Sequence, residues 1–470
     1  MDGLECSEIL WSKIKKSNSN YRFDSHYYEK KYVLLNERLL SKPYWLLGEI
    51  VSKPIQTGHT PSMSNQSNYG GKIAFIKTDN LRTNYIKTNF NDWLSEEGNR
   101  EISRTELEEK DIITTIIGAT EDVIARTALV LSEHLPANIN QNIVQIRVDD
   151  GVALPEYVNS YLNSIYGRDY LRYLSRQTEQ VNLNCQEIAS VLVPQVSMNF
   201  QNKIKDCVEK AYDMQQRAKQ KFQLAHDLLR TIISVDVSSL PLTTCKSFKN
   251  SFKTSGRLDA EYFNPKYEYY EKSIKENKLG FTFVKDKFNL ISNKCDRTLP
   301  QYQYVEIGDI NVGTGVASPN VVLTEELPDN AKILTKTNDV LVSTVRPNRG
   351  AVAILDKDDL LVSGAFTVLR EKSDYPKEVL QVLLRLEMYR DWMLRYNVGT
   401  SYPVIKDNDI LNLPIPVLDK NTQKTIVENV RKSFVLREKS KILLELAIKT
   451  VEKAIETDET SALLWLESQK

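Results

Sequence analysis

The sequence predicts an α/β protein in which two homologous domains are separated by an antiparallel pair of long coiled-coil helices, with pseudo-twofold symmetry. Three observations support this fold class. The 470-residue chain repeats itself once. Each copy alternates β-rich runs with polar loops and then a helix. Each copy also closes with a long segment that contains neither proline nor glycine.

The internal repeat is visible as short blocks that return in the same order. Arg22-Phe23-Asp24 returns 235 residues later as Arg257-Leu258-Asp259. Further along, Ile188–Pro194 matches Ile410–Pro416, where the offset settles at 222. An offset that shrinks and then stays constant indicates two copies that differ by small loop insertions in their first part only.

Within each copy, β-rich runs alternate with loops rich in Gly, Pro, Asn, Ser and Thr. The predicted strands are 72–77, 112–117, 123–131 and 143–148 in the first copy, and 304–308, 340–345, 351–355 and 365–370 in the second. A helix follows, at about 155–173 and 376–395, with proline in a plausible first turn. A short apolar segment marked by proline then leads into the long helix.

The two long segments carry a seven-residue repeat of apolar residues, which predicts a coiled-coil seam. A polar residue stands at the matching seam position of each helix, Gln215 and Arg437, where such residues usually fix the register. For the second helix, the sequence does not decide which residues flank this seam. One candidate row contains Ser433 and Ala447, and the other contains the bulkier Phe434 and Ile448. The residues expected to pair the helices are Ile204, Val208, Ala211, Gln215, Phe222, Leu229, Val430, Arg437, Leu444 and Val451.

An intrachain antiparallel pair is the arrangement we expect, because each amphipathic helix needs a partner for its apolar stripe and the other copy offers an equal one. Packing of each helix on its own domain and pairing with another subunit are the alternatives. The predicted organisation is an N-terminal segment (1–20), a first domain (21–197), a first spacer helix (198–234), a linker (235–254), a second domain (255–418), a second spacer helix (419–457) and a C-terminal tail (458–470).

Composition excludes several classes of protein. Lys+Arg and Asp+Glu both number 62, so wholesale coating of nucleic acid or of an anionic membrane is not expected. Mean hydropathy is −0.39, and no apolar run approaches the length of a membrane span. Five scattered cysteines without a C-x-x-C pair favour a reduced, cytoplasmic protein, and the start of the sequence shows no secretory signal.

No catalytic constellation is recognisable. The four histidines show no metal-ligand spacing, and glycine-rich phosphate loops are absent. Asn264-Pro265 is followed by Lys266, so the Asn-Pro-Pro-aromatic sequence of an adenine methyltransferase is missing. We therefore expect a binding protein without catalytic activity, with no metal site and no cofactor of its own.

The loops of the two copies carry polar and cationic side chains mixed with aromatic ones, as contacts to phosphates and base edges require. These candidate DNA-binding residues are Thr57, His59, Thr60, Ser62, Lys72, Lys77, Thr78 and Arg82 in the first copy, and Lys294, Arg297, Thr298, Tyr302, Tyr304, Arg346, Asn348 and Arg349 in the second.

Two homologous α/β domains, each followed by a long helix, make a chain that resembles the specificity (S) subunit of Type I restriction-modification systems. The resemblance covers nearly the whole chain. The segments that carry it are 57–62 (Thr-Gly-His-Thr-Pro-Ser), 69–73 (Tyr-Gly-Gly-Lys-Ile), 140–144 (Asn-Gln-Asn-Ile-Val), 345–347 (Val-Arg-Pro) and the two proline-marked helix entries. The second copy departs from the pattern, since residues 296–300 (Asp-Arg-Thr-Leu-Pro) stand where a Thr-Pro loop is expected.

The resemblance implies a non-catalytic DNA-binding subunit whose two target-recognition domains each read half of a bipartite site on double-stranded DNA. Two modification subunits that bind S-adenosylmethionine would methylate adenine in each half-site, and two restriction or translocase subunits that use ATP and Mg²⁺ could join them. The paired helices would set the gap between the half-sites. A DNA-binding scaffold or regulator of the same fold, without modification partners, and an unrecognised nuclease are the alternatives.

Overall fold

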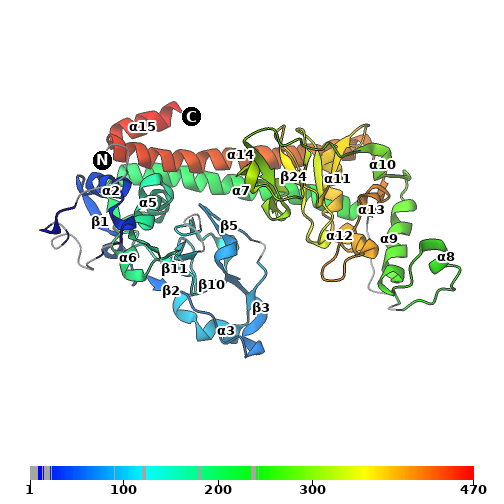
Figure 1. Ribbon diagram of the computed structural model, residues 1–470, viewed down its shortest axis with the longest axis horizontal. Helices are drawn as coiled ribbons and strands as arrows, with labels where there is room; N and C mark the ends of the chain where they lie inside the picture. Colours follow the sequence, from blue (N-terminus) through cyan, green and yellow to red (C-terminus); the bar gives the residue numbers. More distant parts are fainter. Residues whose placement is uncertain are drawn as a thin grey trace. The chain divides into compact units, whose positions relative to one another are not determined.

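The computed structural model describes residues 9–12, 14, 22, 24–88, 90–118, 123–177, 181–233, 235, 240–241 and 243–469. Most of the predicted N-terminal segment and part of the predicted linker lie outside the described residues. The chain divides into unit 1 (Met1–Met214 and Glu438–Lys470) and unit 2 (Gln215–Arg437). Each unit combines helices and short strands with about half of each of two long helices (Figure 1).

Unit 1 contains an α/β domain that precedes the first long helix. Its elements are α2 (Lys30–Leu40), β1 (Tyr44–Leu46), β2 (Gln56–Thr57), β3 (Tyr69–Ile76), β4 (Leu81–Arg82), β5 (Tyr85–Ile86), β6 (Trp93–Leu94), α3 (Glu96–Glu101), β7 (Ile112–Thr115), β8 (Ile117–Gly118), β9 (Thr127–Leu129), β10 (Ala137–Ile139), β11 (Ile143–Ile146), α4 (Pro155–Asn163), α5 (Ile165–Leu174), β12 (Arg176–Gln177), β13 (Val181–Asn182), α6 (Cys185–Ala189) and β14 (Leu192–Pro194).

Unit 2 contains the second α/β domain. Its elements are α8 (Phe252–Ser255), α9 (Pro265–Lys275), β15 (Phe281–Phe283), α10 (Val284–Lys287), β16 (Phe288–Ile291), β17 (Gln301–Val305), β18 (Ile310–Asn311), β19 (Val316–Ala317), β20 (Asn320–Leu323), β21 (Ala331–Leu334), β22 (Val340–Ser343), β23 (Val352–Ile354), β24 (Leu361–Ser363), β25 (Phe366–Glu371), α11 (Lys377–Leu384), α12 (Glu387–Met393), α13 (Asp407–Leu411) and β26 (Pro414–Pro416).

The sheets of the two units are built around comparable central strands. In unit 1 the largest sheet has the order β2-β11-β7-β9, beside a second sheet β10-β3-β6. In unit 2 the order β16-β25-β22-β23 forms one sheet and β20-β17-β24-β21 the other. The strand before each long helix pairs antiparallel with an early strand, β14 with β1 and β26 with β15. Each long helix is thereby anchored to the beginning of its own domain.

The strands lie near their predicted positions but are mostly shorter. The strand expected over 304–308 ends at Val305, because the Asp309 carboxylate accepts the Glu306 N–H at 2.9 Å and closes a 3₁₀ turn. The strand expected over 123–131 is reduced to β9. Side-chain capping of this kind competes with the sheet and is not visible in a β-rich run.

The prediction of a single helix after the strands of each copy is wrong. Each copy has two helices there, α4 and α5 in unit 1 and α11 and α12 in unit 2. In unit 1 the break falls at Ser164, whose backbone is extended and whose hydroxyl accepts the Gly167 N–H at 3.1 Å to cap α5. Gly167 is required there, because a Cβ would lie 2.1 Å from the Tyr161 carbonyl oxygen. In unit 2 the break falls at Leu386, which is also extended.

The long helices are α7 (Met198–Ile233) and α14 (Lys420–Glu456), and they pair in opposite directions. In unit 1, Ser197, just before α7, donates its N–H at 2.9 Å to the side chain of Glu459, just after α14. In unit 2, the end of α7 and the start of α14 share one core cluster that contains Ile233 and Ile426. The predicted antiparallel helix pair is therefore present, and Figure 1 shows the two helices side by side.

Burial shows which of the two candidate rows of α14 flanks the seam. Ser433, Ser440, Ala447 and Ala454 are buried, whereas the larger residues of the other side are mostly half-buried. In unit 2 the Ser433 hydroxyl donates to the Ala218 carbonyl oxygen of α7 at 2.8 Å. Small side chains let the two backbones approach closely, so this row forms the contact.

Matched contacts recur in the two units and support the internal repeat. Arg22 forms a two-bond fork with Asp24 and donates to the Ser175 carbonyl oxygen. Arg257 forms the same fork with Asp259, and it donates to the carbonyl oxygen of Asn397, 222 residues after Ser175. In both copies the arginine ties the start of the domain to the end of its helical pair.

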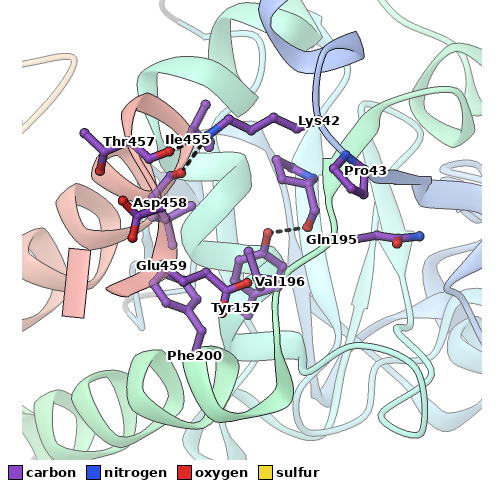
Figure 2. A pocket seen from close by; sticks show the side chains of 13 residues that line it. Lys42, Pro43, Tyr157, Gln195, Val196, Phe200, Ile455, Thr457, Asp458 and Glu459 are labelled. Carbon is purple, nitrogen blue, oxygen red and sulfur yellow. Dashed lines mark hydrogen bonds between the residues drawn. The ribbon is translucent and has the colours of Figure 1, made fainter. Parts of the chain in front are cut away.

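A further helix, α15 (Glu459–Ser468), follows α14 and belongs to unit 1 (Figure 1). Its Ala462 and Leu466 are buried in the core of that unit. Lys42 donates to the carbonyl oxygens of Ala454 and Thr457, each at 3.0 Å, beside a cavity of about 200 Å³ (Figure 2). A cation at the carbonyl end of α14 satisfies free acceptors and complements the helix dipole.

Candidate nucleic-acid interface

In unit 1 the loop 57–62 lies against the turn 140–142. Gly58 makes this approach possible, since a Cβ there would lie 2.2 Å from the Ile139 carbonyl oxygen. Thr57 pairs with Val144 across the sheet, and the Thr60 hydroxyl donates to the Gln141 side chain. Two segments that carried the resemblance, 80 residues apart, thus form one surface that exposes His59 and Ser62.

Lys77 and Thr78 extend this surface. They follow β3, whose last residue Ile76 accepts the Asn140 N–H at 3.2 Å, so both stand next to the 140–142 turn. Lys77 forms an ion pair with Asp92 at 2.9 Å and lies over the Phe75 ring. Half-exposed ion pairs of this kind contribute little to stability, so the ammonium group can be redirected to a phosphate at small cost.

Lys72 and Arg82 are placed less directly for binding. Lys72 is exposed near the middle of β3. Arg82 is half-buried, and its guanidinium donates to the carbonyl oxygens of Asp79 and Leu81. The first copy therefore brings Thr57, His59, Thr60, Ser62, Lys77 and Thr78 together. Lys72 lies in β3 and Arg82 in the separate β4–β5 sheet.

In unit 2 one group of candidate residues surrounds the segment 328–331. Arg297, which has a positive φ of 51°, donates to the carbonyl oxygens of Pro328 and Ala331. Tyr304 is buried and donates to Asn330 at 3.4 Å, and burial raises the pKa of its hydroxyl. Tyr302 is buried as well and accepts the Leu299 N–H. These three side chains shape the loop, while Lys294 and Thr298 beside it are exposed.

The loop after β22 presents the most open group of donors. Arg346, Asn348 and Arg349 are exposed, while Pro347 and Gly350 between and after them are buried. Arg346 has a positive φ of 51°, its N–H donates to the Pro403 carbonyl oxygen at 2.7 Å, and its guanidinium lies 5.4 Å from the centre of the Tyr402 ring. Strained backbone held by surrounding contacts is common where a side chain is presented for function.

The two groups of unit 2 are connected through hydrogen bonds. Asn330, the partner of Tyr304, donates to the Ser363 hydroxyl at 3.1 Å. Two residues further on, Ala365 accepts both the N–H and the hydroxyl of Thr344, at 2.9 Å each. Because Thr344 precedes Arg346 by two residues, these hydrogen bonds link the backbone segments that carry the two groups.

These side chains suit a nucleic acid chemically. Arginine and lysine contact phosphates, arginine can bind guanine through two bonds, and asparagine can do the same with adenine. Sequence reasoning did not single out Gln141, Asn330 or Tyr402 as individual site residues, although Gln141 lies in a segment that carried the resemblance. Tyr402 could not be identified from the sequence, because its contact with Arg346 joins segments more than 50 residues apart.

The helix-pairing residues lie within the units as follows. Ile204, Val208, Ala211, Leu444 and Val451 are buried in the core of unit 1. Phe222, Leu229 and Val430 are buried in the core of unit 2, and Gln215 and Arg437 are half-buried. Near the end of α7, Ile232 is 38 % exposed, and its neighbour Ile233 is buried.

Across the described ranges, no group of three or more His, Cys, Asp or Glu side chains is arranged to hold a metal ion. None of the helices there is long and apolar enough to cross a membrane.

A family model described as "Type I restriction modification DNA specificity domain" matches residues 246–433. Among solved structures, the chain is similar to the HsdS subunit from Thermoanaerobacter tengcongensis, with 15% identity, 88% of this chain and 97% of that chain covered, and a TM-score of 0.30. The Type-I restriction-modification system S subunit from M. genitalium has 10% identity, 89% and 95% coverage and a TM-score of 0.38.

A third similar chain comes from a structure that concerns complex assembly and conformational transition of the type I R-M system, with 14% identity, 88% and 98% coverage and a TM-score of 0.29. All three TM-scores are below 0.5, so these structures do not define the arrangement of this chain. The family model, in contrast, matches a defined segment. Residues 246–433 therefore match a Type I restriction modification DNA specificity domain, and this match supports the resemblance found in the sequence.

Proposed function

We propose that the chain is the non-catalytic specificity subunit of a Type I restriction-modification complex and recognises a bipartite target on double-stranded DNA. Unit 1 reads one half-site and unit 2 the other. Both half-sites are read through the major groove, where base pairs are distinguishable. The α7–α14 pair sets the gap between them, and half-sites read from one face of the duplex have centres about 10 base pairs apart.

One observation carries this proposal. The DNA specificity domain lies in unit 2, and unit 1 repeats its contacts at matched positions, each with a cluster of hydrogen-bond donors and cations. Two readers of modest affinity gain effective concentration only when the spacer fits the distance between their sites. The antiparallel helix pair is the element of the chain suited to act as such a spacer.

Two modification subunits, which bind S-adenosylmethionine, methylate adenine in each half-site under this proposal. Restriction subunits that use ATP and Mg²⁺ join the same complex, and the complex works in the cytoplasm. The specificity subunit itself contributes binding and positioning, with no cofactor of its own.

The test is an exchange of parts followed by sequencing of the methylated DNA. Replacing residues 255–418 by the corresponding domain of another specificity subunit should change one half-site only. Inserting seven residues at matched points of α7 and α14 adds about 10 Å, or roughly three base pairs, and should lengthen the gap while both half-sites persist. Altered half-sites after the insertion would contradict the proposal.

The alternatives give different results. A nuclease would cut plasmid DNA when the purified chain is incubated with Mg²⁺, whereas a reader leaves the plasmid intact. A scaffold or regulator without modification partners would bind the same DNA but would leave no methylated bipartite site in cells that express the chain with its candidate methyltransferase.

A further inference from the structure

Arg385 occupies an unusual place for a cation. It is the C-terminal capping residue of α11, it is only 9 % exposed, and no carboxylate pairs with it among the described residues. Burial, together with the charges of Arg437 and Arg390, lowers the pKa of Arg385 to about 9, so the guanidinium remains charged at neutral pH. A buried cation that keeps its charge needs neutral partners arranged around it.

Those partners join two parts of unit 2. On one side, Arg385 Nη2 donates to the Val312 carbonyl oxygen at 2.6 Å, in the tip of the β18–β19 hairpin. On the other side, its guanidinium carbon lies 4.5 Å from the ring centre of Phe222 on α7. One side chain thus contacts both the recognition domain and the spacer helix.

The hairpin tip is shaped around this side chain. Gly315 has a φ of +71°, and a Cβ there would lie 2.4 Å from Arg385 Nη1 and 2.7 Å from Gln381 Nε2. Gln381, one turn earlier on α11, donates to the Gly315 carbonyl oxygen at 3.1 Å. The strand after the hairpin, β20, pairs with β17, which carries Tyr304. The arginine therefore reaches the frame that holds the candidate DNA-binding residues.

Unit 1 has different residues at the positions of this link. By the offset of 222, Arg385 corresponds to Asn163 and Phe222 corresponds to Leu444. Among the described residues, Asn163 bonds only within its own helix, to Asn159. The hairpin tip is still held, because Asn159, which corresponds to Gln381, donates to Asn84 at 2.8 Å. The amide tether is common to both units, whereas a buried arginine at the position of Arg385 is specific to unit 2.

We propose that Arg385 is a positioning residue that fixes the second recognition domain on α7 and thereby determines how sharply the protein discriminates between gap lengths. This inference rests on the proposed function. The guanidinium acts through the hairpin and the spacer helix rather than by touching DNA. A spacer defines a distance only when its junction with the reader is rigid, since any rotation there spreads the separations that the reader can reach.

The experiment uses the full chain expressed with its modification subunits, and sequencing of methylated DNA yields both half-sites and the distribution of gap lengths. Arg385→Met keeps the length of the side chain and removes the charge and the bond to Val312. We expect unchanged half-sites and about a tenfold loss of discrimination between neighbouring gap lengths. Arg385→Lys should restore discrimination in part, because the charge remains over the Phe222 ring.

Variants of Phe222 and of Gly315 test the same contact from its other sides. Phe222→Leu introduces the residue found at the corresponding position of unit 1 and should broaden the gap distribution, whereas Phe222→Trp should preserve it. Gly315→Ala should broaden the distribution by pushing the hairpin off Arg385. Gly280→Ala is the matched control, because Gly280 also has a positive φ, of 83°, but no atom lies within 4 Å of its added Cβ.

Failure of the role of Arg385 and failure of the proposed function give different results. If Arg385→Met and Phe222→Leu lower methylation at all gap lengths equally, the role is structural only and the inference is wrong. If the unmodified chain yields no bipartite site, the proposed function fails first. Thermal unfolding of each variant is measured in parallel, and Phe222→Leu carries the test if Arg385→Met does not fold.

Discussion

Each unit buries an aspartate at the corresponding position, but the two aspartates differ in the number of their hydrogen-bond partners. Asp111 accepts the guanidinium fork of Arg147 and, in addition, Gln145 Nε2 at 2.6 Å and the Glu108 N–H at 2.7 Å. Asp339 accepts the fork of Arg370 and the Lys336 N–H alone. The two copies therefore hold one strand arrangement with unequal redundancy, and the copy with fewer partners should depend more on its arginine.

The largest expected effect follows from these two arginines. Arg370→Met leaves Asp339 buried with one donor and should lower the free energy of unfolding of unit 2 by about 4 kcal/mol, whereas Arg147→Met should cost unit 1 about 3 kcal/mol. Urea unfolding followed by hydrogen exchange of β22 and β7 measures each unit separately. Equal losses of unfolding free energy in the two units would show that the additional donors of Asp111 do not compensate for the missing arginine.

A second pair of buried carboxylates sharpens the comparison. Glu156 is 1 % exposed and pairs with Lys110 at 2.9 Å, and the corresponding Glu378 is 3 % exposed and pairs with both Lys377 and Arg431. Lys110→Met should destabilise α4 by about 2–3 kcal/mol, and Arg431→Met should destabilise α11 by about 1 kcal/mol, because Lys377 remains.

Amide exchange in the first turns of α4 and α11 measures this difference. Lys205→Met is the matched control. Within the part of the chain that the structure describes, that lysine pairs with the exposed Glu209 alone, at 3.8 Å, so its loss should change little. A larger loss for Arg431→Met than for Lys110→Met would contradict the assignment of Lys377 as a second partner.

The smallest expected effect is on acid stability. The hydrogen bond from Arg257 holds the pKa of Asp259 below its ordinary value. The pKa of Asp24 is also lowered, although burial opposes the bond from Arg22. Since both folded-state values lie below the unfolded one, this stabilisation is present above about pH 4 and is lost as the pH falls through the folded-state values.

We expect a contribution below about 1 kcal/mol from each pair, because both carboxylates are partly exposed. An NMR titration from pH 6 to pH 2 should show Asp259 titrating below Asp24. Titration in the reverse order would mean that the strength of the arginine fork, rather than burial, decides the difference between the two units.

The sequence predicted those parts of the fold that depend on periodicity. Val208 and Leu229 recur at the heptad spacing, so the helix pair could be inferred without knowledge of its contacts. The break at Ser164 could not, because it depends on a hydroxyl that caps a new helix within a run that is otherwise helical. The 11-residue helices α2 and α9 were not predicted, because few of their residues are fully buried and neither is long enough to show a repeated heptad.

The candidate interface was predictable only in part, because its geometry depends on contacts between distant segments. The loop 57–62 and the turn 140–142 were both identified, yet their juxtaposition requires the close approach at Gly58. Arg297 illustrates the opposite case. It was expected to contact DNA, but its guanidinium holds the carbonyl oxygens of Pro328 and Ala331. A residue type alone does not reveal whether its donors are already engaged.

The division of the chain has a consequence for its synthesis. Unit 2 is one uninterrupted stretch, whereas the core of unit 1 includes Leu444, Val451 and Leu466 from beyond it. A ribosome therefore completes unit 2 before unit 1 has all its parts, and at about 5–20 residues per second the earlier segment waits roughly 10–45 s for them. Lys42 is translated early and meets its carbonyl partners only at the end, so the half of the protein that is made first is the last to be assembled.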